Sequence, residues 1–330
     1  MESRRAIAWS WRNVAHGVML ALPAVAASVF DPSLGLPLAV GVLPAAALGL
    51  RSTRRERALV ILVGVVAGAS IFLGSLVAAR AVLAVALVFV LCVVVAVMTA
   101  DPSRRLAPLM LMLGLPLYGA GLSESSWAAG LAAGLLMVGG SVYGWLVSLA
   151  WPEGERARRP ARVPASRTTM LAYGVQIGLA GAAGAALGYA FGVDHPGWAC
   201  TAALLVSRPD TRLLDARGWG RAASVVLGSV VACTIAALSP SHSAIAVLVL
   251  LTLAAGSGTS GSRWYVFPFF STVLVLSMLL LDESESAAHW FLERVALTLL
   301  GVALALLAAW VVPPVAQRAL SAAADSGRSP

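Results

Sequence analysis

The stretch HPGWACTAALLVSRPD, residues 195–210, begins with side chains suited to binding chemistry. Asp194 is a good N-cap residue and Pro196 suits the first turn, so a helix is expected to start here. A helix N-terminus carries free N–H groups and partial positive charge, which attract anions. His195 and Trp198 flank this end and could contact an organic acid. We therefore expect an anion site, although plain positions at a membrane interface would also account for both residues.

Arginine and glutamine side chains add groups that could hold a carboxylate. Arginine pairs with carboxylates through two parallel hydrogen bonds, and Arg208, Arg221 and Arg263 stand near the ends of apolar stretches. Arg57 repeats Arg221 in the first half of the chain, which favours Arg221 as the binding residue. Gln176 is the most polar side chain deep in any apolar stretch. Each arginine taken alone would also fit an ordinary signal of membrane topology.

The same sequence lacks the patterns that enzymes need. It contains no nucleophile–base or metal-ligand constellation and no GxxxxGK[ST] loop, so we expect no catalytic residues, metal, cofactor or internal ATPase. The segment GSGTSG, residues 256–261, matches GxGxxG but lies between two apolar stretches with no strand before it. Cys92, Cys200 and Cys233 are expected to be small core residues, because each lies in a separate apolar stretch.

The elements that must position these residues are membrane helices. The chain has 330 residues, 59% hydrophobic and 12% charged, with a mean hydropathy of +0.88, whereas soluble domains average about 25% charged residues. The apolar stretches bounded by charges or turns are 14–30, 34–50, 58–78, 81–99, 106–122, 127–149, 169–191, 196–207, 222–238, 243–260, 264–281 and 287–312. The sequence therefore predicts an all-α polytopic membrane protein with about twelve transmembrane helices.

The distribution of charge predicts the topology. With the N-terminus in the cytoplasm, 21 of the 23 basic residues, all of them arginine, fall on the inner side, and the loops carry +13 inside and −5 outside. This positive-inside pattern places both termini in the cytoplasm at an inner (plasma) membrane and makes a nucleic-acid partner unnecessary. Glu293 is counted with the outer loops. We expect the first apolar stretch to be retained, although Arg4 and Arg5 precede it as in a signal peptide, because its removal would leave an odd number of spans.

One predicted span is too short for the bilayer. Residues 196–207 would form about 18 Å of helix, against a hydrocarbon core of roughly 30 Å. If this segment did not cross, every later loop would change sides and DESES, residues 282–286, would become cytoplasmic. We therefore expect a short or broken helix with unwound ends. The alternative is a helix that continues to Leu214 with Arg208 snorkelling, which Pro209 disfavours.

A weak internal repeat indicates two parallel halves. Pro32 matches Pro196 and Trp127 matches Trp290 at an offset of 160–164 residues. Six spans per half would make the repeats parallel. The corresponding domains are an N-terminal repeat at 1–152, a basic linker at 153–167, a C-terminal repeat at 168–313 and a disordered cytoplasmic tail at 314–330. In the first half the partner of 196–207 is 34–50, which Pro37 and Pro44 should break.

Residues 195–228, HPGWACTAALLVSRPDTRLLDARGWGRAASVVLG, resemble the fusaric-acid-resistance (FUSC) family of integral membrane transporters. The matching positions are His195, Pro196, Trp198, Ala199, Arg208, Pro209, Asp210, Arg221 and Gly228. RWYVFPFFSTVLVLSMLLLD (263–282) and ERVALTLLGVALALLAAW (293–310) fit the same domain, so the resemblance covers about 168–313 and is faint over 1–152. Gly197 departs from it, because the family usually has an aromatic residue there.

The resemblance implies export of aromatic or other organic carboxylates, with Asp210 joining the site residues named above. Our expectation is a carrier for small organic anions that acts at the broken helices. A channel for the same anions and a non-transporting membrane scaffold are the alternatives. The expected partners are the organic anion and the lipid bilayer, and the chain acts either alone or with further copies of itself in a homo-oligomer.

Overall fold

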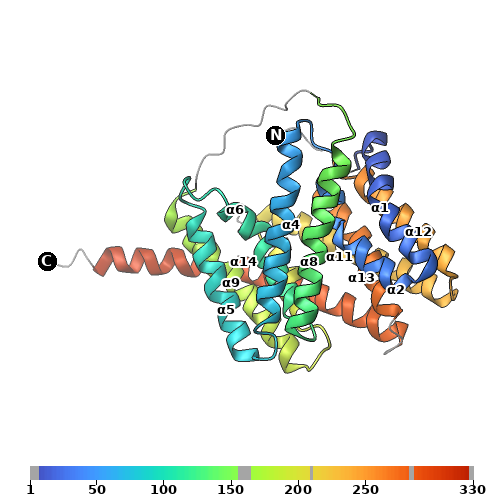
Figure 1. Ribbon diagram of the computed structural model, residues 1–330. Coiled ribbons are helices and arrows are strands. Elements are labelled where there is room, and N and C mark those ends of the chain that lie inside the picture. The colour runs from blue at the N-terminus through green and yellow to red at the C-terminus, as the bar shows by residue number, and fades with distance from the viewer. Residues whose placement is uncertain (1–6, 155–164, 209–210, 282–285, 327–330) are drawn as a thin grey trace. The chain divides into compact units, whose positions relative to one another are not determined.

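The computed structural model describes residues 7–154, 165–208, 211–281 and 286–326, and these residues form helices and their connections (Figure 1). The helices long and apolar enough to cross a membrane are Trp11–Phe30, Arg54–Ser75, Ala81–Met98, Trp127–Ser148, Arg167–Ala190, Leu213–Ala237 and Ala287–Val312. Shorter apolar helices cover Pro32–Gly41, Ala107–Gly121, Gly197–Val206, His242–Gly258 and Trp264–Leu280. The predicted all-α, membrane-embedded class is confirmed.

The helices form two compact units, each built from segments of both halves of the chain. Unit 1 comprises Met1–Phe72, Trp127–Pro160 and Trp219–Ala296, and unit 2 comprises Leu73–Ser126, Ala161–Gly218 and Leu297–Pro330. The division falls within three long helices, α4 (Arg54–Ser75), α11 (Thr211–Ala237) and α14 (Ala287–Ser326).

Unit 1 is organised around α1 (Trp11–Phe30), which packs along α12 (His242–Gly258). The short helix α2 (Pro32–Gly41) contacts α1, α8 (Trp127–Ser148) and α13 (Phe267–Leu280), and α3 (Leu43–Leu48) contacts α8 and α12. Fully buried residues at the centre of this core include Leu20, Leu36, Val249 and Leu274. The helices α4 and α8 lie side by side (Figure 1), and Gly68 of α4 is in close contact with Gly134 of α8.

Unit 2 is organised around α9 (Arg167–Ala190), which packs against α5 (Ala81–Met98) and α10 (Gly197–Val206). The second partner of α10 is α7 (Leu115–Gly121), which follows α6 (Ala107–Leu109) and a π-helical turn, η1 (Met110–Gly114). Gly174 of α9 meets α5 and Gly184 meets α10, so its glycines allow close helix packing. Cys92 and Cys200 are buried in this core, as predicted, while Cys233 in unit 1 is half-buried.

The second helix is short or broken in both halves, as the sequence predicts. The helix α10 has ten residues, about 15 Å, and ends at Val206, because Ser207 turns to an extended ψ of 130°. The hydroxyl of Tyr173 donates to the Ser207 carbonyl oxygen at 3.0 Å and fixes this end. In the first half, α2 ends at Gly41 and α3 begins at Leu43, on either side of the break at Val42.

Three details differ from our expectations. Asp194 does not cap α10; Pro196 is the N-cap residue and has no side-chain cap bond, because the helix starts two residues later than a cap at Asp194 requires. Glu293 lies in the second turn of α14, not in a loop, and is 8% exposed. Residues 314–326 continue α14 up to Ser326, since their alanine-rich sequence favours helix, whereas 327–330 lie outside the described residues.

Candidate functional site

The predicted site residues fall into both units, which are described separately. Unit 1 contains Arg57, Arg221 and Arg263, and unit 2 contains Gln176, His195, Trp198 and Arg208. Asp210 lies outside the described residues, so its surroundings are not part of the site described here.

At the N-terminus of α10 in unit 2, the rings of His195 and Trp198 stack with centroids 4.0 Å apart and planes inclined by 15°. The first N–H groups of this helix already have acceptors: Gly197 N donates to Ser123 Oγ at 3.0 Å and Trp198 N to the His195 carbonyl oxygen at 3.1 Å. Burial raises the pKa of the nearby Glu124 carboxyl, and the charge of His195 opposes this shift. The predicted pair therefore meets, but at a helix end whose first two donors are occupied.

The packing around Gly197 explains why a glycine stands where the family usually has an aromatic residue. A Cβ atom at this position would overlap the carbonyl oxygen of Gly119 in α7, so only glycine allows the two helices to approach this closely. Thr201, one turn later in α10, donates to the Pro116 carbonyl oxygen at 3.0 Å. An aromatic side chain at position 197 would require a wider separation of α7 and α10.

The other two predicted residues of unit 2 do not join the stacked pair. Arg208 follows the C-terminus of α10 and its Nη1 donates to the Ser207 carbonyl oxygen. Burial lowers the pKa of Arg208, and Tyr173 opposes this effect. Gln176 lies in α9, is 5% exposed, and its Nε2 has no hydrogen-bond partner among the described residues.

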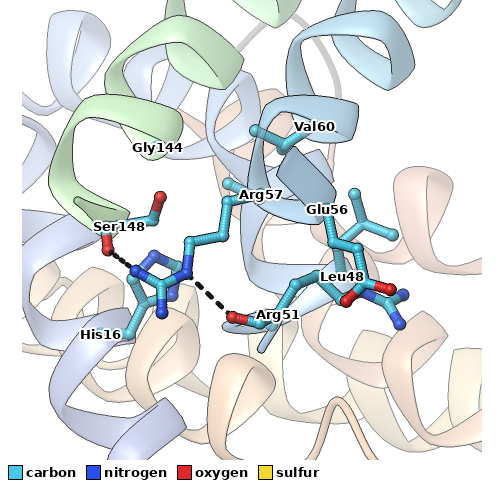
Figure 2. A pocket seen from close by; sticks show the side chains of 10 residues that line it. His16, Leu48, Arg51, Glu56, Arg57, Val60, Gly144 and Ser148 are labelled. Atoms are coloured by element: carbon cyan, nitrogen blue, oxygen red, sulfur yellow. Dashed lines mark hydrogen bonds between the residues drawn. The ribbon is translucent and has the colours of Figure 1, made fainter. Parts of the chain in front are cut away.

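In unit 1, Arg57 is 2% exposed and clamps two loops (Figure 2). Its acceptors are the carbonyl oxygens of Arg51, Ser52, Ser148, Trp151 and Pro152, at 2.7 to 3.3 Å. A guanidinium has five N–H donors, and here each has a carbonyl acceptor. Three of these carbonyls lie at the C-terminal end of α8, where a cation is favoured. In this arrangement Arg57 offers no donor to an anion.

His16 lies beside this clamp and lines a small cavity of about 20 Å³ (Figure 2). It is 2% exposed, and both ring nitrogens are buried. Its ring lies nearly perpendicular to that of Trp151, at a centroid distance of 5.5 Å. A cavity of this size holds about one water molecule.

The surroundings of Arg221 differ from those of Arg57. It is 6% exposed on α11, its Nε is buried without a hydrogen-bond partner, and no hydrogen bond from its side chain occurs among the described residues. The charge of Arg294, from α14, lies close enough to act on it electrostatically. Burial of a cation without a partner costs several kcal/mol, at an order-of-magnitude level. An anion between these helices would remove that cost.

Arg263 lies at the exposed start of the segment that leads into α13. Its Nη1 donates to the Tyr265 hydroxyl at 3.3 Å, and Tyr265 belongs to a 3-10 turn, η2 (Trp264–Val266). The Tyr265 ring packs over Gly220, and its carbonyl oxygen accepts from Ser224 Oγ. The structure thus brings the Arg263–Tyr265 pair to the residues on either side of Arg221.

Sequence reasoning missed a buried carboxylate on α14. Glu293 Oε2 lies 3.6 Å from His289 Nε2, an ion pair when the imidazole is protonated. The neighbouring Trp290 is buried against Ala232 and Leu276, so this face of α14 lies against α11 and α13. The signal was available as the i, i+4 spacing of histidine and glutamate ahead of a long apolar run.

Comparison with known proteins supports the resemblance found in the sequence. Residues 181–308 match the model of the family described as fusaric acid resistance protein-like, which confirms the predicted resemblance and indicates a membrane transport-related protein. No curated protein and no solved structure matches the chain.

Proposed function

We propose that this protein moves small organic carboxylates across the inner membrane, as an exporter, with Arg221 as the anion-binding residue. The observation that carries the proposal is the buried Arg221 side chain, which has no hydrogen bond among the described residues and lies under the influence of the Arg294 charge. Arg221 also lies inside the segment that matches the transporter family.

The contrast with Arg57 supports this assignment. Both arginines are buried in unit 1 and each stands seven residues before a glycine, Gly64 or Gly228. All five N–H donors of Arg57 bind backbone carbonyl oxygens. The guanidinium N–H donors of Arg221, in contrast, remain available for two parallel hydrogen bonds to a ligand carboxylate. Arg57 therefore enters the proposal as a structural residue. The other predicted site residues remain predicted contacts of the anion along its transport path. They are His195, Trp198, Arg208, Arg263, Gln176 and Asp210.

We further propose twelve spans in two parallel six-helix repeats, with both termini in the cytoplasm. Seven long and five shorter apolar helices supply the required number of segments. The helix contacts support the repeat, because the first and second helices of each half pack on the fourth and fifth helices of the other. In unit 1 these pairs are α1 with α12 and α2 with α13, and in unit 2 they are α9 with α5 and α10 with α7.

Flux through proteoliposomes tests the transport proposal. Purified wild-type protein should move a labelled aromatic acid such as 4-hydroxybenzoate, and Arg221→Ala should lower the flux at least about tenfold, which corresponds to about 1.4 kcal/mol. Arg221→Lys should give an intermediate rate, because it keeps the charge and loses the bidentate fork. Arg80→Ala, which removes an exposed arginine, is the matched control and should transport normally.

The form of the flux separates a carrier from a channel. Saturation and acceleration by a counter-gradient would support a carrier, whereas a rate proportional to concentration would support an organic-anion channel. If the wild type moves none of a panel of aromatic and aliphatic acids, or if Arg221→Ala transports as well as Arg80→Ala, the proposal is wrong and a non-transporting scaffold becomes the better interpretation.

A further inference from the structure

A cavity of about 500 Å³ lies within unit 1 between α1, the region around the break after α2, and α8. Its walls include Leu20, Ala24, Leu38, Val42 and Leu136, and none of the residues that line it carries a charge. The one hydroxyl in the lining belongs to Tyr143, and it already donates to the Met19 carbonyl oxygen at 2.6 Å. The volume lies in the range of ligand-binding cavities, 300–1,000 Å³ in order of magnitude, and the chemistry of the walls fits hydrocarbon.

The glycines of α8 show how the sequence of this helix shapes the cavity. Gly134, Gly140 and Gly144 each meet atoms of a neighbouring helix where a Cβ would stand, so they permit close packing. Gly139, in contrast, is exposed and has no atom within 4 Å of its Cβ position. A glycine in a helix costs about 1 kcal/mol relative to alanine. Gly139 does not repay this cost by helix packing; it enlarges the cavity.

The depth of the cavity identifies its surroundings. Leu20 and Ala24 lie near the centre of α1 (Trp11–Phe30), and Leu136 and Gly139 lie near the centre of α8 (Trp127–Ser148). The middle of a membrane-spanning helix lies in the hydrocarbon core, where lipids present acyl chains and no head groups. The lining residue Leu135 is 62% exposed, so the part of the wall that it contributes to the surface is apolar as well.

We propose that this cavity is a binding site for one acyl chain of a membrane phospholipid. An apolar cavity left empty would forfeit the dispersion contacts of all the atoms that line it, and the bilayer supplies hydrocarbon at this depth. The absence of charge from the lining makes it unsuited to the carboxylate of a transported acid. The site is therefore distinct from the proposed anion site at Arg221 and does not depend on it.

Native mass spectrometry of the full-length protein tests the proposal. The protein is equilibrated with equal amounts of phosphatidylglycerol and phosphatidylethanolamine of the same chains, and then delipidated stepwise in detergent. The wild type should retain one phospholipid, with little preference between the two head groups. Gly139→Trp should lower the retained fraction severalfold, because the indole would occupy the cavity. Gly139→Leu provides a second filling variant if the tryptophan variant folds poorly.

Leu146→Trp is the matched control, since it adds the same ring to an exposed position of α8 that does not line the cavity. It should retain lipid like the wild type. Equal retention by the wild type and both filling variants would overturn the proposal. So would a strong preference for phosphatidylglycerol, which would indicate a head-group site. Displacement of the lipid by an aromatic acid, or a dimer that dissociates on Gly139→Trp, would assign the cavity to the substrate or to a second copy of the chain.

Discussion

At the scale of single residues, we expect the same substitution at Arg57 and at Arg221 to change the stability in different ways. Arg57→Met would leave five backbone carbonyls without their charged donor, and hydrogen bonds to charged groups contribute about 1.5–3 kcal/mol each. We expect Arg57→Met to lower the stability by more than about 3 kcal/mol. Arg221→Met removes a buried cation that has no hydrogen bond to any residue that the structure describes, and it should leave the stability unchanged or raise it. Thermal unfolding in detergent, with no organic acid present, measures both.

A fall in melting temperature for Arg221→Met as large as that for Arg57→Met would show that Arg221 has a structural partner, and would weaken its assignment to anion binding. The sequence could not distinguish the two arginines. Both precede a glycine by seven residues, but three acceptors of Arg57 lie 91 to 95 residues away at the end of α8. Whether a buried donor is satisfied depends on such long-range contacts, which residue spacing does not encode.

At the scale of helices, the N-cap residue Asp31 should make the stability of the protein depend on pH. It caps α2, since Ser33 N donates to Asp31 Oδ1 at 2.8 Å, and the hydrogen bonds from Ser33 lower the pKa of the Asp31 carboxyl below its ordinary value of 3.8. A lowered pKa means that the folded state binds this proton less tightly than the unfolded state. The stabilising contribution is therefore complete above pH 3.8 and lost as the pH falls through the lowered pKa.

Asp31→Ala should accordingly lower the melting temperature at neutral pH, whereas Asp31→Asn should retain most of the cap, because asparagine is also a preferred N-cap residue. The difference between the wild type and Asp31→Asn should shrink in acid. Melting curves between pH 3 and pH 7 in detergent would check this. A difference that grows as the pH falls would contradict the direction of the pKa shift.

The contact between α7 and α10 gives a second prediction at this scale. Gly197→Ala would place a methyl group on the Gly119 carbonyl oxygen, and because backbone cannot yield like a flexible side chain, the helices must separate. Overpacking of this kind costs about 1–3 kcal/mol. Gly139→Ala, which meets no atom within 4 Å, is the control and should be neutral or stabilising. Equal melting temperatures for the two variants would show that α7 and α10 are not in this close contact.

Much of the helix pattern could be predicted from local chemistry. Runs of apolar residues locate the long helices, and the short α10 follows from the distance between Pro196 and Pro209. The predicted role of Asp194 as the N-cap is wrong because Pro196 occupies that position, two residues further along the chain. The donor that the cap should have satisfied bonds instead to Ser123, which lies 74 residues earlier in the chain.

At the scale of the whole molecule, hydropathy and charge were enough to predict a membrane-embedded all-α chain, because the bilayer imposes both patterns on the sequence. The composition of the two units could not be predicted in this way. Each unit combines helices from both halves of the chain, for example α1 with α12. In lipid, the pairing of helices depends on the fit of small residues rather than on overall hydropathy. Hydropathy averaged over a window of residues therefore does not reveal which helices pair.

The proposed topology makes a prediction about the whole chain that depends on the ten-residue helix α10. In a background without Cys92, Cys200 and Cys233, the variants His195→Cys and Ser243→Cys place one thiol on either side of α10 and α11. If both helices cross the membrane, a membrane-impermeant maleimide added outside intact cells should label both thiols. If α10 does not cross, a single crossing by α11 separates the two positions, and only one of them will react from outside. Labelling of Ser52→Cys only after permeabilisation is the control for an inner loop.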